Sequence, residues 1–207
     1  MYTRFTISES LGGLLDRMDD KGKATVSEMM HFYHNQYQDL KQKYDPLSVA
    51  ANIQRTVQEA IDAQVKSVPN RISCAKGCSF CCFQMVDITN DEAELLTQYA
   101  SEEGIEIDYD TLEKQIVNNN DEYMALEAKT RRCIFLDKEG GCSVYEHRPM
   151  ACRKLIVVSD SKHCDTELRL GDRVGKLVDL EAEVLTCSSL NATMSGSMAK
   201  MLIKTKK

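Results

Sequence analysis

Tryptophan is absent from this 207-residue sequence, and proline (3 residues) and glycine (10 residues) are scarce. The shortage of proline and glycine excludes collagen-like and linker-like chains, because both kinds depend on those residues. Positive charge is also in deficit, since 26 Lys and Arg face 32 Asp and Glu, a formal net charge of −6. We therefore do not expect a nucleic-acid partner, which would require a basic face.

Long hydrophobic runs are missing as well. The longest aliphatic run covers residues 155–158, whereas a membrane-spanning helix needs about 20 apolar residues. The first residues contain no signal-peptide core, because Thr6, Ser8 and Glu9 interrupt their apolar positions. These absences predict a cytoplasmic protein that does not associate with membranes.

Cysteine, by contrast, is in excess, with nine residues. In a cytoplasmic protein thiols stay reduced, and closely spaced cysteines are more typical of metal binding than of disulfides. The odd number also fits poorly with complete pairing. Hydrophobic residues at 43% and charged residues at 28% are otherwise ordinary for a globular chain.

The first part of the chain carries no cysteine and has a helical pattern. Residues 25–28 (Thr-Val-Ser-Glu) have the form of a capping box and predict a helix to about Tyr44. Asp45-Pro46 is typical of a helix start, and the apolar spacing behind it predicts a helix to about Val68.

Two more capping signals follow the first cysteines. Residues 89–92 (Thr-Asn-Asp-Glu) predict a helix to about Ser101, and Asp108 predicts another to about Lys129. Two β-prone runs around Asp-Lys-Glu-Gly-Gly predict a hairpin over residues 133–145.

Further along, Pro149 predicts the start of a helical turn, and residues 155–158 predict a buried strand. Helical periodicity returns over residues 168–185, whereas the tail beyond Cys187 is weakly specified. We predict a mainly α fold with a small β-hairpin (α+β), in which helices pack on an irregular cysteine-rich metal-binding core.

Three segments are expected to form one compact unit. These are an N-terminal helical region (1–70), a cysteine-cluster metal-binding domain (71–166), and a C-terminal helix with a flexible tail (167–207).

The densest cysteine group is Cys74, Cys78, Cys81 and Cys82. In a helix these thiols would share a stripe of about a quarter turn, and in a loop they could wrap one ion. Gly77 would allow the backbone to bend toward that ion. Crowded thiolates repel one another, so a metal cation or an iron–sulfur core would neutralise them.

A second cysteine group extends over the hairpin, the turn and the loop that follow. The eight cysteines that we predict as metal ligands are Cys74, Cys78, Cys81, Cys82, Cys133, Cys142, Cys152 and Cys164. They allow two four-ligand sites, or one site with spare cysteines, and Cys187 is interpreted as a bystander. The four histidines that could substitute as ligands are His31, His34, His147 and His163, although surface positions are the favoured interpretation.

The spacing leaves the metal open, because zinc and a [4Fe–4S] cluster both take four thiolates. The first three cysteines, Cys74, Cys78 and Cys81, also have the spacing of the radical S-adenosylmethionine motif. The chain lacks the repeated strand–helix units of the barrel in which that motif functions. The expected cofactor is therefore an iron–sulfur cluster, 4Fe-4S in the first place, or zinc.

The segments CAKGCSFCC and CIFLDKEGGCSVYEHRPMACRK resemble the YkgJ-type cysteine-cluster family, described as zinc- or iron-chelating domains. The positions that match the family's pattern are Cys74, Cys78, Cys81, Cys82, Cys133, Cys142, Tyr145, Arg148, Pro149, Cys152 and Arg153. Cys164 fits a further downstream cysteine that is common in the family. The resemblance covers about residues 72–165 and implies metal or iron–sulfur binding. A distant relative, the flagellin lysine N-methylase, has a similar cluster.

Three functions remain open on this basis. The favoured one is a metal- or iron–sulfur-binding module; the alternatives are an iron–sulfur-dependent enzyme resembling a protein lysine methyltransferase, and a zinc-stabilised module that binds a protein partner. Arg148 and Arg153 could lie beside anionic thiolates, or could form structural salt bridges. Conventional catalytic motifs were not found in the sequence, so enzyme status stays open.

Overall fold

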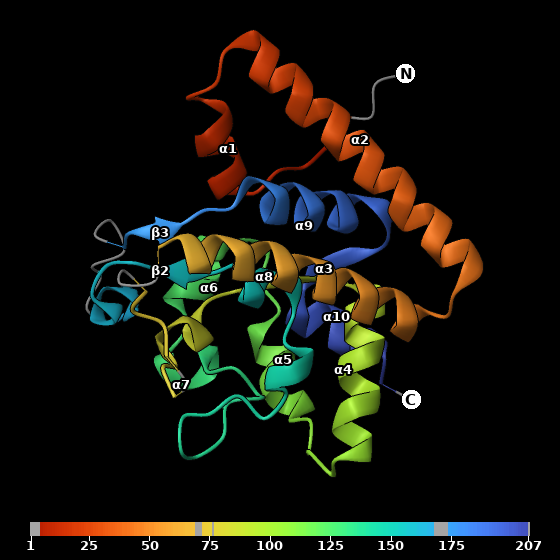
Figure 1. Ribbon diagram of the computed structural model, residues 1–207. Coiled ribbons are helices and arrows are strands. Elements are labelled where there is room, and N and C mark those ends of the chain that lie inside the picture. The colour runs from red at the N-terminus through yellow and green to blue at the C-terminus, as the bar shows by residue number, and fades with distance from the viewer. Residues whose placement is uncertain (1–4, 69–71, 76, 168–173, 207) are drawn as a thin grey trace.

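The computed structural model describes residues 5–68, 72–75, 77–167 and 174–206. Its α-helices are α1 (Glu9–Leu15), α2 (Asp20–Lys43), α3 (Pro46–Ser67), α4 (Asn90–Glu102), α5 (Tyr109–Gln115), α6 (Asn120–Ala125), α7 (Ala128–Arg131), α8 (Met150–Arg153), α9 (Leu180–Ala192) and α10 (Met198–Lys204). Short 3₁₀ helices are η2 (Phe80–Phe83), η3 (Tyr145–His147) and η4 (Ser161–Cys164). The described parts confirm the mainly α fold class (Figure 1).

Two small antiparallel sheets complete the described structure. Strand β1 (Asp87–Thr89) pairs with β4 (Ser195–Ser197), and β2 (Ile156–Val157) pairs with β3 (Lys176–Leu177). The first sheet joins the segment just after the first cysteine group to the C-terminal region. The second confirms the predicted strand within residues 155–158.

The N-terminal helices follow their caps. The predicted start of α2 at residues 25–28 was wrong: Asp19 caps the helix by accepting a hydrogen bond from Gly22 N (2.8 Å), so Thr25 lies within it. The predicted ends of α2 near Tyr44 and of α3 near Val68 are confirmed. So is the Asp45 cap, which accepts from Ser48 N.

The capping box before α4 is confirmed by two reciprocal hydrogen bonds. Glu92 N donates to Thr89 Oγ1 and Thr89 N donates to Glu92 Oε2, both at 3.1 Å. The single helix predicted from Asp108 to Lys129 was wrong, because this segment divides into α5, α6 and α7. Asn119 caps α6, and asparagine is better suited to a cap than to a helix interior.

The predicted hairpin over 133–145 is reduced to a turn. A single bridge pairs Leu136 with Cys142, and Ser143 N donates to Phe135 O (2.8 Å). Tyr145 already belongs to η3. The helical turn predicted after Pro149 is confirmed as α8.

The C-terminal region differs from its prediction. Residues 168–173 of the predicted helix lie outside the described residues, residues 176–177 form β3, and α9 begins only at Leu180. The segment predicted as a flexible tail contains the end of α9, β4 and α10. Because α9 is buried on nearly every side, its sequence lacks the one-sided apolar period that identifies a surface helix.

Helix α9 is the central element of the fold (Figure 1). One apolar cluster packs it against α1 and α2, and a second packs it against α3 and α8. A third cluster joins α4, α5 and α10 to Phe135. These clusters draw residues from the N-terminal, central and C-terminal segments, so elements outside the cysteine-rich part support it.

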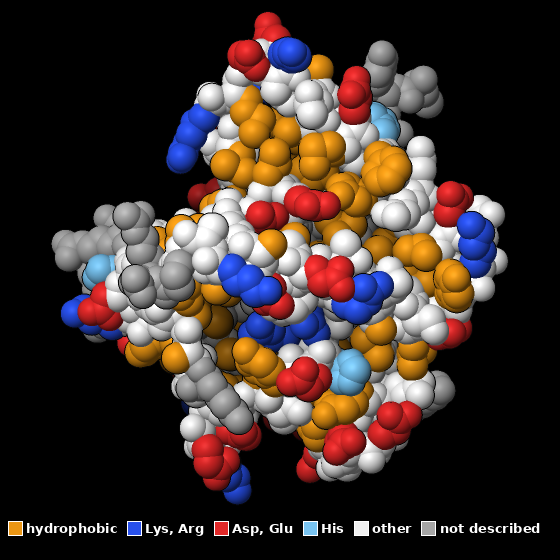
Figure 2. Space-filling model, in the orientation of Figure 1, with side chains coloured by type: hydrophobic (Ala, Val, Ile, Leu, Met, Phe, Trp, Pro, Cys, Tyr) orange, Lys and Arg blue, Asp and Glu red, His pale blue; other side chains and the backbone are white. Residues whose placement is uncertain are grey.

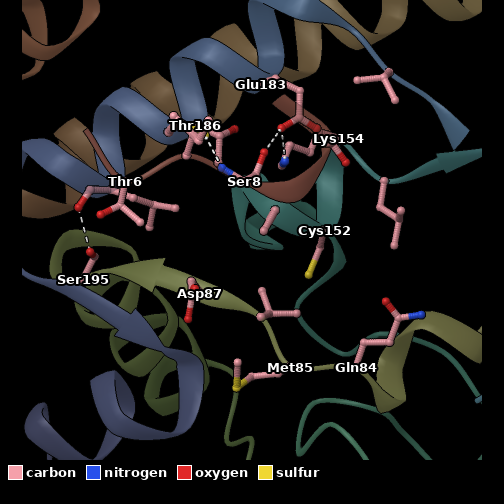
Figure 3. A pocket seen from close by; sticks show the side chains of 18 of the residues that line it. Thr6, Ser8, Gln84, Met85, Asp87, Cys152, Lys154, Glu183, Thr186 and Ser195 are labelled. Carbon is pink, nitrogen blue, oxygen red and sulfur yellow. Dashed lines mark hydrogen bonds and ion pairs between the residues drawn. The ribbon is translucent and has the colours of Figure 1, made fainter. Parts of the chain in front are cut away.

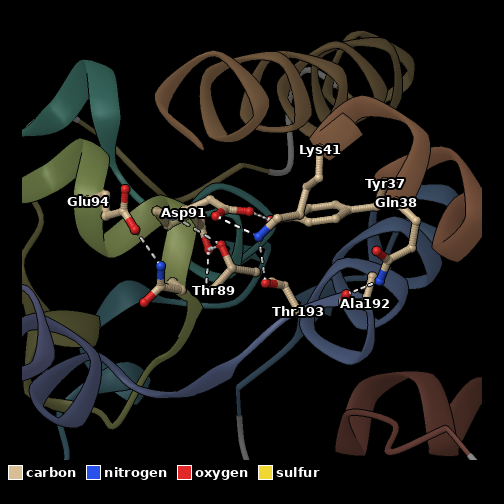
Figure 4. A network of polar contacts seen from close by, with 10 residues as sticks. Tyr37, Gln38, Lys41, Thr89, Asp91, Glu94, Ala192 and Thr193 are labelled. Carbon is tan, nitrogen blue, oxygen red and sulfur yellow. Dashed lines mark hydrogen bonds and ion pairs between the residues drawn. The ribbon is translucent and has the colours of Figure 1, made fainter. Parts of the chain in front are cut away.

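A buried polar network ties α2 to α4 and to the end of α9 (Figure 4). Asp91 is 0% exposed and accepts hydrogen bonds from Tyr37 Oη (2.6 Å) and Lys41 Nζ (3.0 Å). Lys41 Nζ also donates to Thr193 Oγ1 (2.9 Å). A buried carboxylate is tolerated here because both oxygens have donors.

The surface carries scattered charges of both signs, and apolar side chains gather on the face shown over α1 and α2 (Figure 2). Phe32 on α2 is 61% exposed. Among the described helices, none is both long and apolar enough to traverse a bilayer.

Candidate metal centre

Eight of the nine cysteines, Cys81 among them, are linked by mutual electrostatic or hydrogen-bond effects, and all nine are free thiols. Burial raises the pKa of five of them, and the charge of Cys81 adds to this effect at each: Cys74, Cys133, Cys142, Cys152 and Cys164. Cys82 forms a hydrogen bond with Cys81, and the charge of Cys78 acts to raise the pKa of Cys74 and Cys164. The sequence-predicted ligands are therefore brought into one region.

Backbone contacts bring these distant segments together. Cys81 and Cys82 lie on η2, and Cys133 N donates to Cys82 O (2.8 Å), which joins the two cysteine groups. Helix η2 also contacts η4, which ends at Cys164. Residues 74–82 do not form one continuous helix among their described members, because Gly77 has φ +88° and η2 begins only at residue 80. Of the two arrangements considered for the first cysteine group, a helix or a loop, the described residues form a loop followed by η2.

Hydrogen bonds from backbone N–H groups reach several sulfurs. Val157 N donates to Cys74 Sγ at 3.3 Å, and backbone hydrogen bonds also act on Cys133 and Cys142 to lower their pKa values against the larger effect of burial. Such donors favour thiolate over thiol. They are the partners that a thiolate metal ligand requires.

Burial favours the protonated form of several of these thiols. It raises the pKa of Cys133 and Cys164 to about 11, and that of Cys152 well above the ordinary range. The hydrogen bond with Cys82, followed by burial, raises the pKa of Cys81. Metal ions bind thiolates, so loading this site must displace protons.

Arg148 is a cation beside the thiols. Burial raises the pKa of Cys74 and Cys142, and the hydrogen bond with Cys82 together with burial raises that of Cys81. The charge of Arg148 acts in the opposite direction and lowers the pKa of all three thiols. Its guanidinium lies 4.3 Å from the centre of the Tyr145 ring, and its buried Nε has no hydrogen-bond partner among the described residues. An unsatisfied N–H donor next to thiols fits an anionic thiolate centre.

Arg153 has a structural role instead. It is 8% exposed and donates from Nε to Arg148 O (2.8 Å), with further hydrogen bonds to Glu146 O and Gln58 Oε1. These bonds fix the turn that carries Arg148 and leads to Cys152. Of the two arginines considered from the sequence, Arg148 acts on Cys74, Cys81 and Cys142, whereas Arg153 interacts through its charge with Cys152.

The donor set fits a soft metal chemically, because thiolates suit zinc and iron–sulfur centres. The distances between the side chains do not yet match a metal site. Within the described ranges, no three His, Cys, Asp or Glu side chains form a group that could hold one ion. Four thiolates on a single zinc would lie about 3.8 Å apart, given Zn–S bonds of about 2.3 Å. The thiols share one region but are spread more widely than one ion requires.

The remaining sequence candidates lie in different surroundings. Cys187 is buried in α9, where its Sγ accepts a hydrogen bond from Ser8 N (3.4 Å). His31 and His34 pack edge-on against Phe5. His147 packs against Tyr99, and His163 lies on η4 beside Cys164.

Sequence reasoning missed two buried residues that position the cysteines. Arg131 is 3% exposed and donates to Thr166 Oγ1 (2.8 Å) and Phe83 O (3.4 Å), next to two of the thiols. Glu92 accepts from Met150 N (2.7 Å) and so holds the start of α8. Only the capping box marked Glu92 in the sequence, and nothing marked Arg131.

Replacing Arg148 by glutamine should shift metal uptake to higher pH. Removing the cation makes the neighbouring thiolates harder to form, so more alkaline conditions are needed to load the site. We expect the apparent zinc affinity at neutral pH to fall by roughly tenfold. Competition with a chromophoric chelator over a pH series measures both quantities. R148K keeps the charge and serves as the control; equal midpoints for wild type and R148Q would contradict the assignment.

The family comparison agrees with this geometry. Residues 73–167 match the model of the CxxCxxCC family, described as a "Putative zinc- or iron-chelating domain". The match covers slightly less than half of the chain and contains all eight clustered cysteines. The search of curated proteins and the search of solved structures found no match. The resemblance predicted from the cysteine motifs is thus confirmed: residues 73–167 match the cysteine-cluster family of zinc- or iron-chelating domains.

Proposed function

We propose that the clustered cysteines hold a thiolate metal centre, in the first place an iron–sulfur cluster. The observation that carries the proposal is the position of Cys81, whose charge acts on five other thiols drawn from four separate segments. Buried thiols of like charge repel once they ionise, so their assembly is best explained by a cation that they bind together.

One four-thiol set is suggested by the thiols whose charges act on Cys152. Burial is the main cause that raises the pKa of Cys152, and the charges of Cys133, Cys81 and Cys142 follow. In addition to burial, the charges of Cys142 and Cys81 act to raise the pKa of Cys133. We propose these four as ligands, since both a [4Fe–4S] cluster and a structural zinc take four.

We propose a second group among the remaining clustered thiols. Cys164, besides its burial, is affected by Cys81, Cys74 and Cys78. These residues, together with Cys82, could complete a second site. Metal stoichiometry distinguishes one centre from two.

The cluster form is supported by the unsatisfied Nε of Arg148. Inorganic sulfides of a cluster add hydrogen-bond acceptors beyond the four thiolates, and such hydrogen bonds tune the cluster's reduction potential. When bound, a cluster would supply one-electron redox chemistry, whereas zinc would supply folding stability.

Anaerobic purification with a UV–visible spectrum, metal analysis and acid-labile sulfide analysis tests this function. We expect a brown protein with absorbance near about 400 nm and iron and sulfide in equal amounts. A colourless protein with stoichiometric zinc would overturn the cluster but support the thiolate centre. A folded protein that binds neither metal under reducing conditions would overturn both.

A further inference from the structure

A cavity of about 400 Å³ lies between the cysteine cluster and α9 (Figure 3). Its volume is in the range of small-molecule sites, about 300–1,000 Å³. Cys81 and Cys152 line the cavity, and part of its wall comes from residues 6–8 and α9, outside the segment that matches the family model. A molecule bound here would therefore lie next to the cysteine cluster.

The wall formed by residues 6–8 is fixed by hydrogen bonds. Thr6 N donates to Asn191 Oδ1 (2.9 Å), and Asn191 Nδ2 donates back to Thr6 O (2.7 Å). Ser8 Oγ donates to Glu183 Oε2 (2.7 Å). These bonds hold the N-terminal segment on α9, so this wall forms without a ligand.

Most of the cavity lining is apolar, and its larger apolar side chains include Met85, Leu155 and Leu190. Asp87 and Lys176 also line the cavity, but both are exposed, so solvent screens their charges. Neither of these charges selects a ligand strongly. The apolar lining alone would accept any short hydrocarbon body, so selection depends on polar groups that are shielded from solvent.

One charged pair on the cavity wall is shielded in this way. Lys154 Nζ lies 2.5 Å from Glu183 Oε2, and the two side chains are 14% and 5% exposed. Figure 3 shows this pair beside Ser8, on the opposite side of the view from Met85. The two charges compensate each other, so this wall is polar but has no net charge. A ligand with a net charge would leave one buried charge uncompensated, which costs free energy.

The hydrogen-bonding capacity of this pair is only partly used by the described residues. An ammonium has three N–H donors, and within the described part of the chain Lys154 Nζ has one acceptor, Glu183 Oε2. The same oxygen accepts from Ser8 Oγ, whereas no described residue donates to Glu183 Oε1. The pair therefore has donors and an acceptor side by side for a ligand. A primary carboxamide has the complementary groups, a carbonyl oxygen that accepts and an N–H that donates.

We propose that this cavity binds an uncharged primary carboxamide with a short apolar body. Its carbonyl oxygen accepts from Lys154 Nζ, its N–H donates to Glu183 Oε1, and its hydrocarbon part packs on the apolar lining. Water can form the same hydrogen bonds, so a ligand gains affinity only if it reproduces both of them while it buries apolar surface. The site goes beyond the proposed metal centre and does not depend on it.

Calorimetric titration of the full chain at neutral pH with pentanamide, 2-hexanone, pentylamine and pentanoate tests the site. The probes have hydrocarbon parts of similar length and differ in their head groups: an amide, a ketone without an N–H donor, a cation and an anion. We expect pentanamide to bind most tightly. The ketone should bind roughly tenfold more weakly, because it leaves one hydrogen bond to a charged group unmade. Equal affinities for pentanamide and 2-hexanone, or tighter binding of pentylamine or pentanoate, would overturn the proposal.

Two substitutions should change which probe is preferred. E183Q leaves the Lys154 ammonium without its carboxylate and should make pentanoate the preferred probe, whereas K154Q should make pentylamine the preferred one. The matched controls, E28Q and K43Q, remove exposed charges of α2 outside the cavity and should keep the preference for pentanamide. If E183Q and K154Q are folded by circular dichroism and still prefer pentanamide, the pair does not select the ligand. The ranking of the four probes on the unaltered chain tests the site even if these variants do not fold.

Metal content is measured on the same samples, so that the two proposals can fail separately. A metal-free protein that still prefers pentanamide contradicts only the metal centre. A metal-loaded protein that does not bind pentanamide contradicts only the carboxamide site.

Discussion

Replacing Cys81 by serine is expected to remove most of the bound metal, with the metal-to-protein ratio falling roughly tenfold or more. The charge of Cys81 acts on members of both proposed thiol groups. A serine hydroxyl is a poor substitute for a thiolate, because its oxygen is a harder ligand than sulfur and the group stays protonated. Elemental analysis of anaerobically purified protein gives the ratio, and the visible spectrum reports an iron–sulfur cluster directly.

The matched control is C187S, which makes the same atomic change at a buried cysteine of α9. Its thiol interacts with Ser8, away from the cluster. We expect C187S to keep its metal. We expect C81S to lose folding stability together with its metal, because the free energy of metal binding contributes to the free energy of folding in thiolate metal sites. Loss of metal in C187S but not in C81S would contradict the proposed centre.

The free energy of unfolding of the Asp91→Ala variant is expected to be about 3–5 kcal/mol lower than that of the wild type. The substitution leaves the Lys41 ammonium and the Tyr37 hydroxyl without the carboxylate that both contact. It also separates α4 from α2 at the end of α9, where Lys41 reaches Thr193. Urea unfolding followed by far-UV circular dichroism, under matched metal loading, measures the difference.

Glu102→Ala provides the comparison on the same helix. Glu102 is exposed and accepts a hydrogen bond from Gln98, so its removal should change stability by no more than about 0.5 kcal/mol. If D91A were no more destabilised than E102A, the buried network would not hold these helices together. A Lys41→Met and Asp91→Ala double-mutant cycle then isolates the energy of the ion pair itself.

Local signals predicted local structure well. The Asp45-Pro46 start of α3 and the capping box of α4 are confirmed because each is a hydrogen-bonding pattern within four residues. The largely buried α9 could not be recognised, since small and apolar residues face nearly every side of it. The division after Asp108 depends on Asn119, whose capping tendency competes with a weak helical period.

The candidate site was predictable in its chemistry but not in its arrangement. The cysteine motifs and the family resemblance marked about residues 72–165 as a zinc- or iron-chelating segment, and a family model with that description matches residues 73–167. Which thiols bind metal stays a prediction. The joining of the two cysteine groups and the different contacts of Arg148 and Arg153 depend on segments far apart in the chain, which no short motif encodes.

The pairing of β1 with β4, and of residue Thr6 with Asn191 across 185 positions, has a consequence for biosynthesis. Ribosomes make the chain from its N-terminus, so the cysteine-rich segment is complete before α9 and β4 exist. Until those last elements are made, the walls that they contribute beside Cys81 and Cys152 are missing. The walls beside Cys81 and Cys152 are thus complete only after the C-terminal elements have been synthesised.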